Sequence, residues 1–320
     1  MPSMLVSGMS VGVGAGASID IQPPASQEWL IHDLGNSLAF VANVADISIS
    51  LRDGVHNDTI LVNDPVIDAS RRYRMYLFYI TNGCYLRVTN TGGAGANISW
   101  FGERVRSGLT VSQINTIGAG ASIFIQPPPG QTWEIYYFAA DIWTGAGDRN
   151  PDVSIGITDG TLIASNTILP TQNVGQDKIL RWIIDDTTYL RVTDTSAGGL
   201  DFGFSGRRVQ HTCVGGIQDV AGGGTLDIQP PAGQEWVITE LSSEQWAGGG
   251  APNNKPDITV SLRVGANLST FLEAGSISNC AVWGREWKLA LDNTNFLRIA
   301  NVNVGNNEVG WLGYLKRTYS

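Results

Sequence analysis

The chain repeats one short stretch three times, and the clearest copy reads Ile228-Gln-Pro-Pro-Ala-Gly-Gln-Glu-Trp236. The other copies, Ile21–Trp29 and Ile125–Trp133, keep the Ile-Gln-Pro-Pro string and place a tryptophan at the same offset. The three tryptophans are 104 and 103 positions apart. Recurrence at a constant period indicates one structural unit that is used repeatedly. The sequence therefore predicts three copies of a single module.

Two longer segments recur in step with this stretch and set the extent of each module. One begins with aspartate and then alternates apolar and small polar side chains: Asp46–Leu51, Asp152–Ile157 and Asp257–Leu262. The other follows an aromatic residue with Leu-Arg: Tyr85–Asn90, Tyr189–Asp194 and Phe296–Asn301. A glycine stands near the end of each copy, at Gly102, Gly206 and Gly313. In this register the modules span residues 1–104, 105–207 and 208–320.

The alternation within these segments predicts the fold class. Ile47, Ile49 and Leu51 fall on one side of an extended chain, with polar residues between them. This period of two is typical of a β-strand with one buried face. Each module contains seven or eight such runs separated by glycine-rich turns, and no run has a sustained helical period. We therefore expect an all-β protein of three tandem homologous β-sandwich modules, of jelly-roll or Greek-key type.

The repeated stretch itself predicts structural anchors. We expect the tryptophans Trp29, Trp133 and Trp236 to anchor the three cores, because an indole buries a large apolar area. Proline cannot sit inside a sheet, so each diproline should form a rigid turn or lie at a sheet edge. These prolines are Pro23 and Pro24, Pro127 and Pro128, and Pro230 and Pro231.

Composition and charge exclude several classes of protein. Hydrophobic residues make up 42 % of the 320 residues, which argues against intrinsic disorder, and 39 glycines fit a fold with many turns. The formal net charge is −9, and no dense cluster of Lys and Arg is present. Nucleic acid is therefore an unfavourable partner. No apolar run is long enough to span a membrane as a helix.

Residues that could carry catalysis are few and do not recur between the modules. His32, His56 and His211 stand at non-equivalent positions and form no zinc-protease pair. The cysteines, Cys84, Cys213 and Cys280, lack metal-type spacing. Residues 148–152 and 253–257 offer oxygen ligands for calcium, but turn formation explains them better, because Arg149 and Lys255 stand among the ligands. The sequence therefore predicts no enzyme, no cofactor and no metal site.

The loop after the repeated tryptophan differs most between the copies, and variable loops on a constant framework often carry binding. Two of these loops hold a further tryptophan, Trp143 and Trp246, and the first copy has Phe40 nearby. These three aromatic residues are the candidate contact residues for a partner or ligand. They could stack on a surface glycan or fill a pocket on a protein partner. The alternative is that each ring folds over the end of its own sandwich.

The tandem modules and the string Ile228–Trp236 resemble virion structural proteins of tailed bacteriophages. This resemblance implies a non-enzymatic protein of the virion, present in many copies or as a homo-oligomer, with capsid or tail subunits as partners. Capsid decoration or cement, a head or tail spike and a tail fibre are the roles that it implies. It assigns no catalytic or binding residue. The alternative interpretation is a carbohydrate-binding adhesin or lectin-like array that acts through Trp143 and Trp246.

Overall fold

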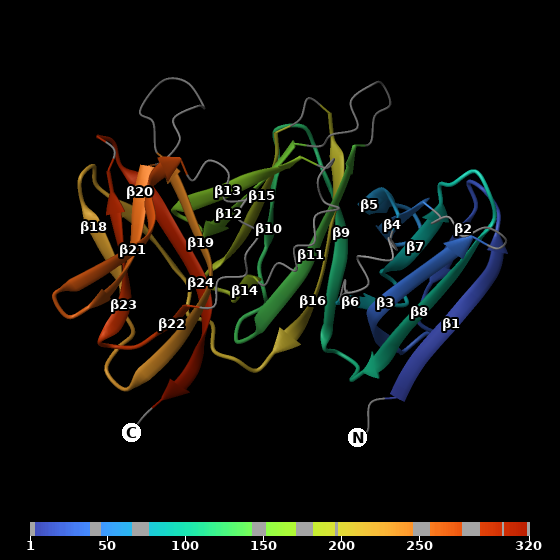
Figure 1. The fold of residues 1–320 in the computed structure, drawn as a ribbon, viewed down its shortest axis with the longest axis horizontal. Coiled ribbons are helices and arrows are strands. Elements are labelled where there is room, and N and C mark those ends of the chain that lie inside the picture. Colours follow the sequence, from blue (N-terminus) through green and yellow to red (C-terminus); the bar gives the residue numbers. More distant parts are fainter. Residues whose placement is uncertain are drawn as a thin grey trace.

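The fold is known from a computed structural model, drawn in Figure 1, which describes residues 4–38, 46–65, 77–142, 152–170, 182–195, 198–245, 257–276, 289–302 and 304–318. These residues form 24 strands, and none of them is helical. The expectation of an all-β protein is confirmed.

The strands divide into three groups of eight in chain order. The first module contains β1 (Met4–Val13), β2 (Ser18–Ile21), β3 (Glu28–Leu38), β4 (Asp46–Arg52), β5 (Asn57–Pro65), β6 (Phe78–Thr81), β7 (Tyr85–Asn90) and β8 (Ala96–Val105). The second contains β9 (Thr110–Ile117), β10 (Ser122–Ile125), β11 (Thr132–Ile142), β12 (Asp152–Thr158), β13 (Ile163–Pro170), β14 (Trp182–Ile184), β15 (Tyr189–Asp194) and β16 (Leu200–Val209). The third contains β17 (Gly216–Val220), β18 (Thr225–Ile228), β19 (Gln234–Gln245), β20 (Asp257–Val264), β21 (Asn267–Ser276), β22 (Leu289–Leu291), β23 (Asn295–Asn301) and β24 (Asn307–Thr318).

Each module is built from two four-stranded antiparallel sheets with the same strand order. In the first module the orders are β1-β8-β3-β6 and β2-β7-β4-β5. The second module repeats them as β9-β16-β11-β14 and β10-β15-β12-β13. The third has β17-β24-β19-β22 and β18-β23-β20-β21. Eight strands in two facing sheets make a jelly roll. The predicted fold class, three tandem homologous β-sandwich modules, is therefore confirmed.

Each module encloses a hydrophobic core of its own between its two sheets. The residues predicted to point inward are buried there, including Ile47, Ile49 and Leu51 in β4. Their counterparts in β12 and β20 lie in the second and third cores, although Leu262 is only half-buried. The alternation therefore identified the buried face of these strands correctly.

The Ile-Gln-Pro-Pro stretch carries the chain from one sheet of a module to the other. It follows β2, β10 and β18 and leads into β3, β11 and β19. In every copy the first proline is buried and the second is exposed. The carbonyl of the second proline accepts the N–H of the glutamine three positions later, at 3.0, 3.0 and 3.1 Å in the three modules. The diproline thus forms a closed turn at the sheet edge.

The glutamine of the same stretch makes a contact that the sequence did not predict. Its side-chain amide donates to a backbone carbonyl in the turn between two later strands. The three bonds run from Gln22 to Asn82 (2.6 Å), from Gln126 to Asp186 (2.8 Å) and from Gln229 to Asn293 (2.6 Å). The glutamine therefore ties its stretch to a distant turn in every module, which gives a reason for the recurrence of this residue.

The repeated tryptophans pack at the rim of the three cores. Trp29, Trp133 and Trp236 are half-buried against the core of their own module. Each indole N–H donates to the glutamine two positions earlier in the chain, at 3.1, 3.1 and 2.9 Å. Each ring is therefore only partly covered by its core, and the anchoring role of the three tryptophans stays a prediction.

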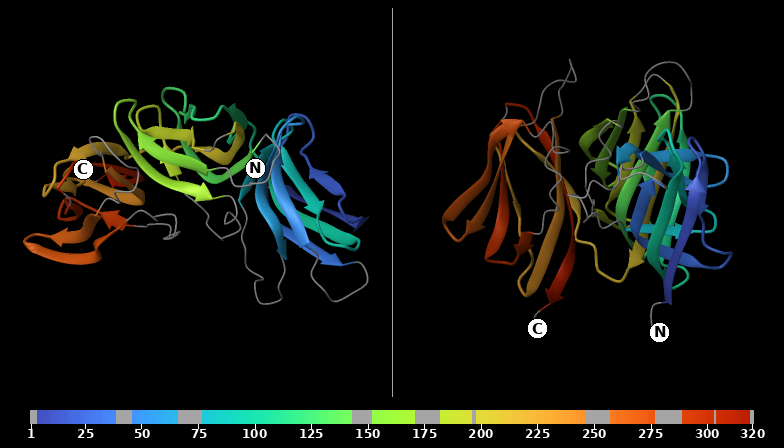
Figure 2. Two further views of the ribbon diagram at one scale, coloured as in Figure 1. Left: turned by 90° about the horizontal axis from the view of Figure 1, so that it is seen from above. Right: turned by 45° about the vertical axis from the view of Figure 1, so that its right-hand side comes forward.

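The modules follow one another in chain order along an arc, with the first and the third at its two ends (Figure 2). The strands that close the first two modules, β8 and β16, run on to Val105 and Val209. Only residues 106–109 and 210–215 connect them to the next module. We propose the same three modules as the sequence predicted, with the first two boundaries moved from 104 and 207 to the ends of these strands at Val105 and Val209.

Candidate assembly interface

Consecutive modules meet through one arrangement of strands that occurs twice. We call the outer face of a module the side of its sheet β1-β8-β3-β6, or the equivalent sheet, that points away from its own core. The edge strands β5 and β6 contact the outer face of the second module on β9, β11 and β16. The equivalent strands β13 and β14 contact the outer face of the third module on β19 and β24. An edge of one module therefore covers the outer face of the next. We call the contact between the first and second modules the first interface, and the contact between the second and third modules the second interface.

The first interface satisfies the backbone of the edge strand β6. The N–H of Tyr79 donates to Ser205 Oγ at 3.0 Å. Its carbonyl accepts from Ser205 Oγ at 2.8 Å and from Ser112 Oγ at 2.6 Å. An unpaired strand edge is open to pairing with other chains. Two serines of the second module close this edge at Tyr79.

An ion pair between the buried Glu134 and the half-buried Arg207 lies beside these serines. Glu134 is fully buried, and its Oε2 accepts from Nε and Nη2 of Arg207, both at 2.9 Å. The guanidinium carbon of Arg207 lies 5.9 Å from the ring centres of Tyr79 and Tyr136, and these rings stack at 5.6 Å. Burial disfavours the charge of Arg207, but the hydrogen-bonded carboxylate of Glu134 favours it, and the pKa of Arg207 is raised overall. Burial has the opposite effect on the two tyrosines: it raises the pKa of Tyr79 and of Tyr136, and both stay neutral.

Apolar contacts complete the first interface. The rings of Phe78 and Tyr137 are 4.4 Å apart, and Ile114 packs against the core of the first module. The connecting turn is held by Glu28, whose two carboxylate oxygens accept from the N–H groups of Gly108 and Thr110 at 2.5 and 2.8 Å. These contacts fix the second module to the first at several separate points.

The second interface uses the same strands with mostly apolar side chains. Leu312 of β24 is fully buried within the core of the second module. Cys213 donates from Sγ to the carbonyl of Ile183 at 3.3 Å, and burial raises the pKa of this thiol. A protonated thiol is a poor nucleophile. Cys213 therefore acts here as a packing residue.

The hairpin between β12 and β13 makes the remaining contacts of the second interface. The N–H of Ile163 donates to Glu308 Oε2 at 2.9 Å, and the carbonyl of Ala164 accepts from Ser242 Oγ at 3.0 Å. A Cβ placed on Gly310 would lie 3.0 Å from the side chain of Ala164. The close approach of β13 to β24 therefore depends on a small residue at this position.

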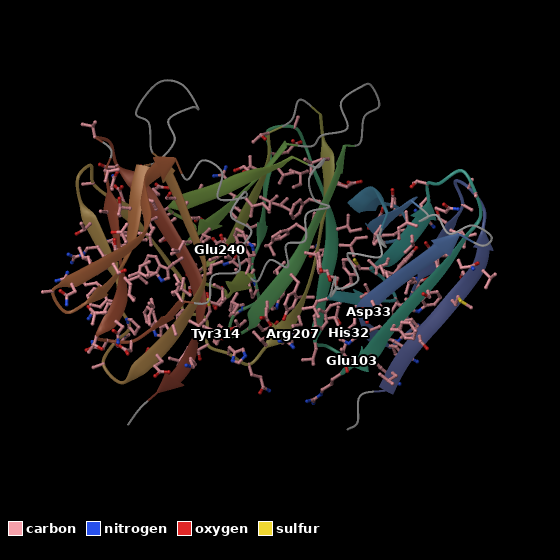
Figure 3. All side chains as sticks on the ribbon, in the orientation of Figure 1. His32, Asp33, Glu103, Arg207, Glu240 and Tyr314 are labelled. Carbon is pink, nitrogen blue, oxygen red and sulfur yellow. The ribbon has the colours of Figure 1, made fainter. Side chains whose placement is uncertain are left out.

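Strand pairing shows which residues of the three outer faces are equivalent. Gly102, Gly206 and Gly313 lie opposite Ile31, Ile135 and Ile238, and a β-bulge follows in each module. A Cβ on any of these glycines would come within 2.2 Å of a backbone oxygen of the neighbouring strand, so only glycine fits. Phe101, Ser205 and Leu312 are then equivalent, as are Glu103, Arg207 and Tyr314; Figure 3 labels the second set.

The outer face of the first module differs from the other two in its exposure. Phe101 exposes 58 % of its surface, whereas the equivalent Ser205 and Leu312 expose none. On the neighbouring strand β1, Leu5 is 87 % and Met9 65 % exposed. His32 and Glu103 lie 3.8 Å apart on the same face, which Figure 3 labels. The described part of the chain therefore presents one outer face with large apolar side chains in contact with solvent.

The candidate contact residues Phe40, Trp143 and Trp246 lie outside the described residues, as do Cys280 and most of both segments considered for calcium. In the described ranges, no three His, Cys, Asp or Glu side chains gather as metal ligands. No helix in those ranges could cross a membrane. Cys84 and Cys213 are free thiols.

The sequence did not identify the interface residues, although one signal was present. Residues 135–140 are apolar without alternation, and such a run is typical of a strand covered on both faces. In the structure this part of β11 has its own core on one side and the first module on the other. Glu134, which precedes the run, gave no sign that it would be buried and paired.

Comparisons with known proteins give only remote similarity. No family model matches the sequence, and no curated protein does. A protein of unknown function from Pseudomonas aeruginosa is 12 % identical over 65 % of this chain and 82 % of its own, with a TM-score of 0.23. The major capsid protein P2 of bacteriophage PM2 is 13 % identical over 65 % and 98 %, with a TM-score of 0.24. A structure described as the triple jelly roll fold and turret assembly in an archaeal virus is 11 % identical over 98 % and 88 %, also at 0.24.

Proposed function

We propose that this chain is a non-enzymatic structural protein of a virus particle, assembled there in many copies through the faces of its sandwiches. Within the particle we propose a role as capsid decoration or cement, or as a head or tail spike. The single observation that carries the proposal is the repeated interface, in which the edge of one jelly roll covers the outer face of the next. A fold that joins identical units in this way is suited to building a surface. The viral setting rests on the sequence resemblance of the tandem modules to virion proteins.

The roles of charged side chains support a structural function. Arg87 and Arg298 each bind an aspartate on the neighbouring strand through two bonds of 2.6–2.8 Å. Arg191, at the equivalent position, bonds to Ser122 at 3.1 Å instead. Glu134 and Arg207 join two neighbouring strands of the second module, and the ring of Tyr79 from the first module packs on this pair. These groups hold strands or modules together, which is the role that cross-strand pairs of opposite charge have in sheets.

Partners and location follow from the same proposal. We propose capsid or tail subunits as the partners and the virion as the location. The net charge of −9 disfavours the packaged nucleic acid as a direct partner. Position in the shell depends on which protein meets the outer face of the first module.

Mass spectrometry of purified particles of the virus that encodes this chain tests the proposal. We expect its peptides in many copies per particle, and a salt wash that removes adsorbed host proteins should leave them in place. Particles that lack these peptides would refute a virion role.

A glycan titration separates this proposal from the adhesin alternative. Tryptophan fluorescence of the purified chain should stay constant as glycans are added. A saturable quench that disappears in Trp143→Ala or Trp246→Ala would favour a carbohydrate-binding array instead.

A further inference from the structure

We propose that copies of this chain associate head to tail, with the hairpin β20–β21 and the edge strand β22 of one copy covering the outer face of the first module of the next. This contact would be a third use of the interface that already joins the modules within the chain. The inference deepens the proposed function and takes its biological setting from it, but the contact itself can be measured on the isolated chain.

The receiving surface is the outer face formed by β1, β8 and β3. Its centre is Phe101, whose counterparts Ser205 and Leu312 are both fully covered by the preceding module. Met9 is equivalent to Ile114, which packs into the core of the module before it. The first module therefore carries the apolar half of the interface at the positions that are covered elsewhere.

The donating surface is the far edge of the third module. Ala290 of β22 is equivalent to Tyr79 and Ile183, both of which are buried under the next module, yet Ala290 is exposed. Leu268 of the hairpin is equivalent to Ile163, whose N–H bonds to Glu308, and it is 54 % exposed. The backbone N–H and C=O groups that point outward from an exposed edge strand favour pairing with another chain.

The chemistry of the receiving face predicts how the contact responds to salt. The internal interfaces place a carboxylate, Asp201 or Glu308, where the preceding hairpin arrives. In the first module this position is Asn97, and its side-chain oxygen accepts from the N–H of Gly12 at 2.9 Å. At this border position the contact would therefore meet a neutral amide, and added salt should have little effect through it. The ionisable groups that the receiving face carries nearer its centre are His32 and Glu103.

One copy carries both halves of this contact, so the interface is heterologous. Such contacts generate closed rings when the rotation between copies closes, and open filaments when it does not. Association should therefore proceed beyond a dimer. This behaviour distinguishes the proposed contact from a two-fold dimer, which stops at two copies.

Sedimentation velocity over a wide range of concentrations tests the contact. The wild-type chain should form species larger than a dimer as the concentration rises. Phe101→Asp blocks the receiving face and Leu268→Asp blocks the donating edge, so each variant alone should stay monomeric. A one-to-one mixture still contains one intact copy of each half. It should form a dimer and nothing larger.

A matched control is available at Phe124, which is 57 % exposed on β10. The equivalent positions hold Asp20 and Asp227, which pair with Arg87 and Arg298. Phe124→Asp therefore makes the same chemical change at a site that accommodates aspartate, and it should associate like the wild type. Circular dichroism checks that all three variants keep the β fold.

Three results would overturn the inference: a wild-type chain that stays monomeric at every concentration, a Phe101→Asp variant that associates like the wild type, or a mixture that gives no dimer. These outcomes are independent of the virion proposal. Particles that contain the chain would uphold the proposed function even if the isolated chain failed to associate. Association without any presence in particles would uphold the contact alone.

Discussion

The two interfaces within this chain place the same strands together and fill the contact with different chemistry. Between the first and second modules, serines bond to the backbone of Tyr79 beside the ion pair of the buried Glu134 and the half-buried Arg207. Between the second and third, Leu312 enters the neighbouring core, and valine and tyrosine replace the ion pair as Val237 and Tyr314. The geometry is therefore independent of any one side-chain pair.

The features common to both interfaces belong to the backbone. Each outer face has a β-bulge after the position where only glycine fits, and each receives a short edge strand of the preceding module. A bulge bends its strand and increases the local twist. We infer that the bulge and the glycine shape the receiving face, while the side chains fill it in whichever way the module provides.

The largest effect should come from breaking the ion pair of the first interface. Arg207→Ala leaves the buried Glu134 without its guanidinium partner. Because Arg207 is itself 37 % exposed and water screens the pair, we expect a loss at the lower end of the range for buried pairs, about 3–4 kcal/mol of unfolding free energy. The double variant Glu134→Val with Arg207→Tyr copies the third module and should recover most of that loss. Urea unfolding followed by circular dichroism measures both. A double variant as unstable as Arg207→Ala would contradict the interchangeability of the two chemistries.

The second interface should lose stability through a cavity. Leu312→Ala removes a fully buried side chain from the core of the second module, so we expect a loss of about 2–4 kcal/mol in unfolding free energy. The same urea experiment applies, with Val304→Ala as a control at an exposed position. A loss no larger than that of the control would mean that the third module is not docked on the second.

A smaller effect is expected at the equivalent position of the first interface. Ser205→Ala removes the hydroxyl that bonds to the N–H and the carbonyl of Tyr79, although Ser112 still serves the carbonyl. One buried N–H is left unpaired, which should cost about 1–2 kcal/mol. Thermal unfolding of this variant should therefore fall between those of the wild type and Leu312→Ala. A cost above that of Leu312→Ala would reverse the order predicted here.

The smallest effect concerns pH, and it should be confined to the first interface. The bond to Asp53 raises the pKa of His56, and the charge of Asp201 across the interface adds to this effect. A raised pKa stabilises the folded chain while His56 is protonated, below its ordinary value of about 6.5, and this stabilisation is lost as pH rises through the folded value. The chain should therefore unfold at a higher temperature at about pH 6 than at about pH 8.

The second module provides the control for this pH dependence, because Leu162 stands at the position equivalent to His56. His56→Leu should remove the difference between the two melts. An NMR titration in which His56 shows a pKa below the ordinary value would refute the assignment.

Much of the fold could be predicted from the sequence because its signals are local and occur three times. The alternation in Asp46–Leu51 and its counterparts identified buried faces, and the diproline identified a turn. Glu134 and Arg207 could not be predicted in this way. They are 73 positions apart on neighbouring strands of one module, and the rings of Tyr79 and Tyr136 that pack on the pair come from two different modules. The candidate contact residues Phe40, Trp143 and Trp246 remain predictions.

The central claim is that one interface joins these modules and, in the described part of the chain, leaves the outer face of the first module and the edge strand β22 uncovered. Hydrogen exchange of the backbone amides in a dilute solution of the chain tests it most directly. The amide of Tyr79, bonded to Ser205, should exchange slowly, whereas the amide of Ala290, at the equivalent position of the exposed edge, should exchange rapidly. Equally rapid exchange at Tyr79 and Ala290 would show that the first two modules are not docked in solution, and would contradict the account.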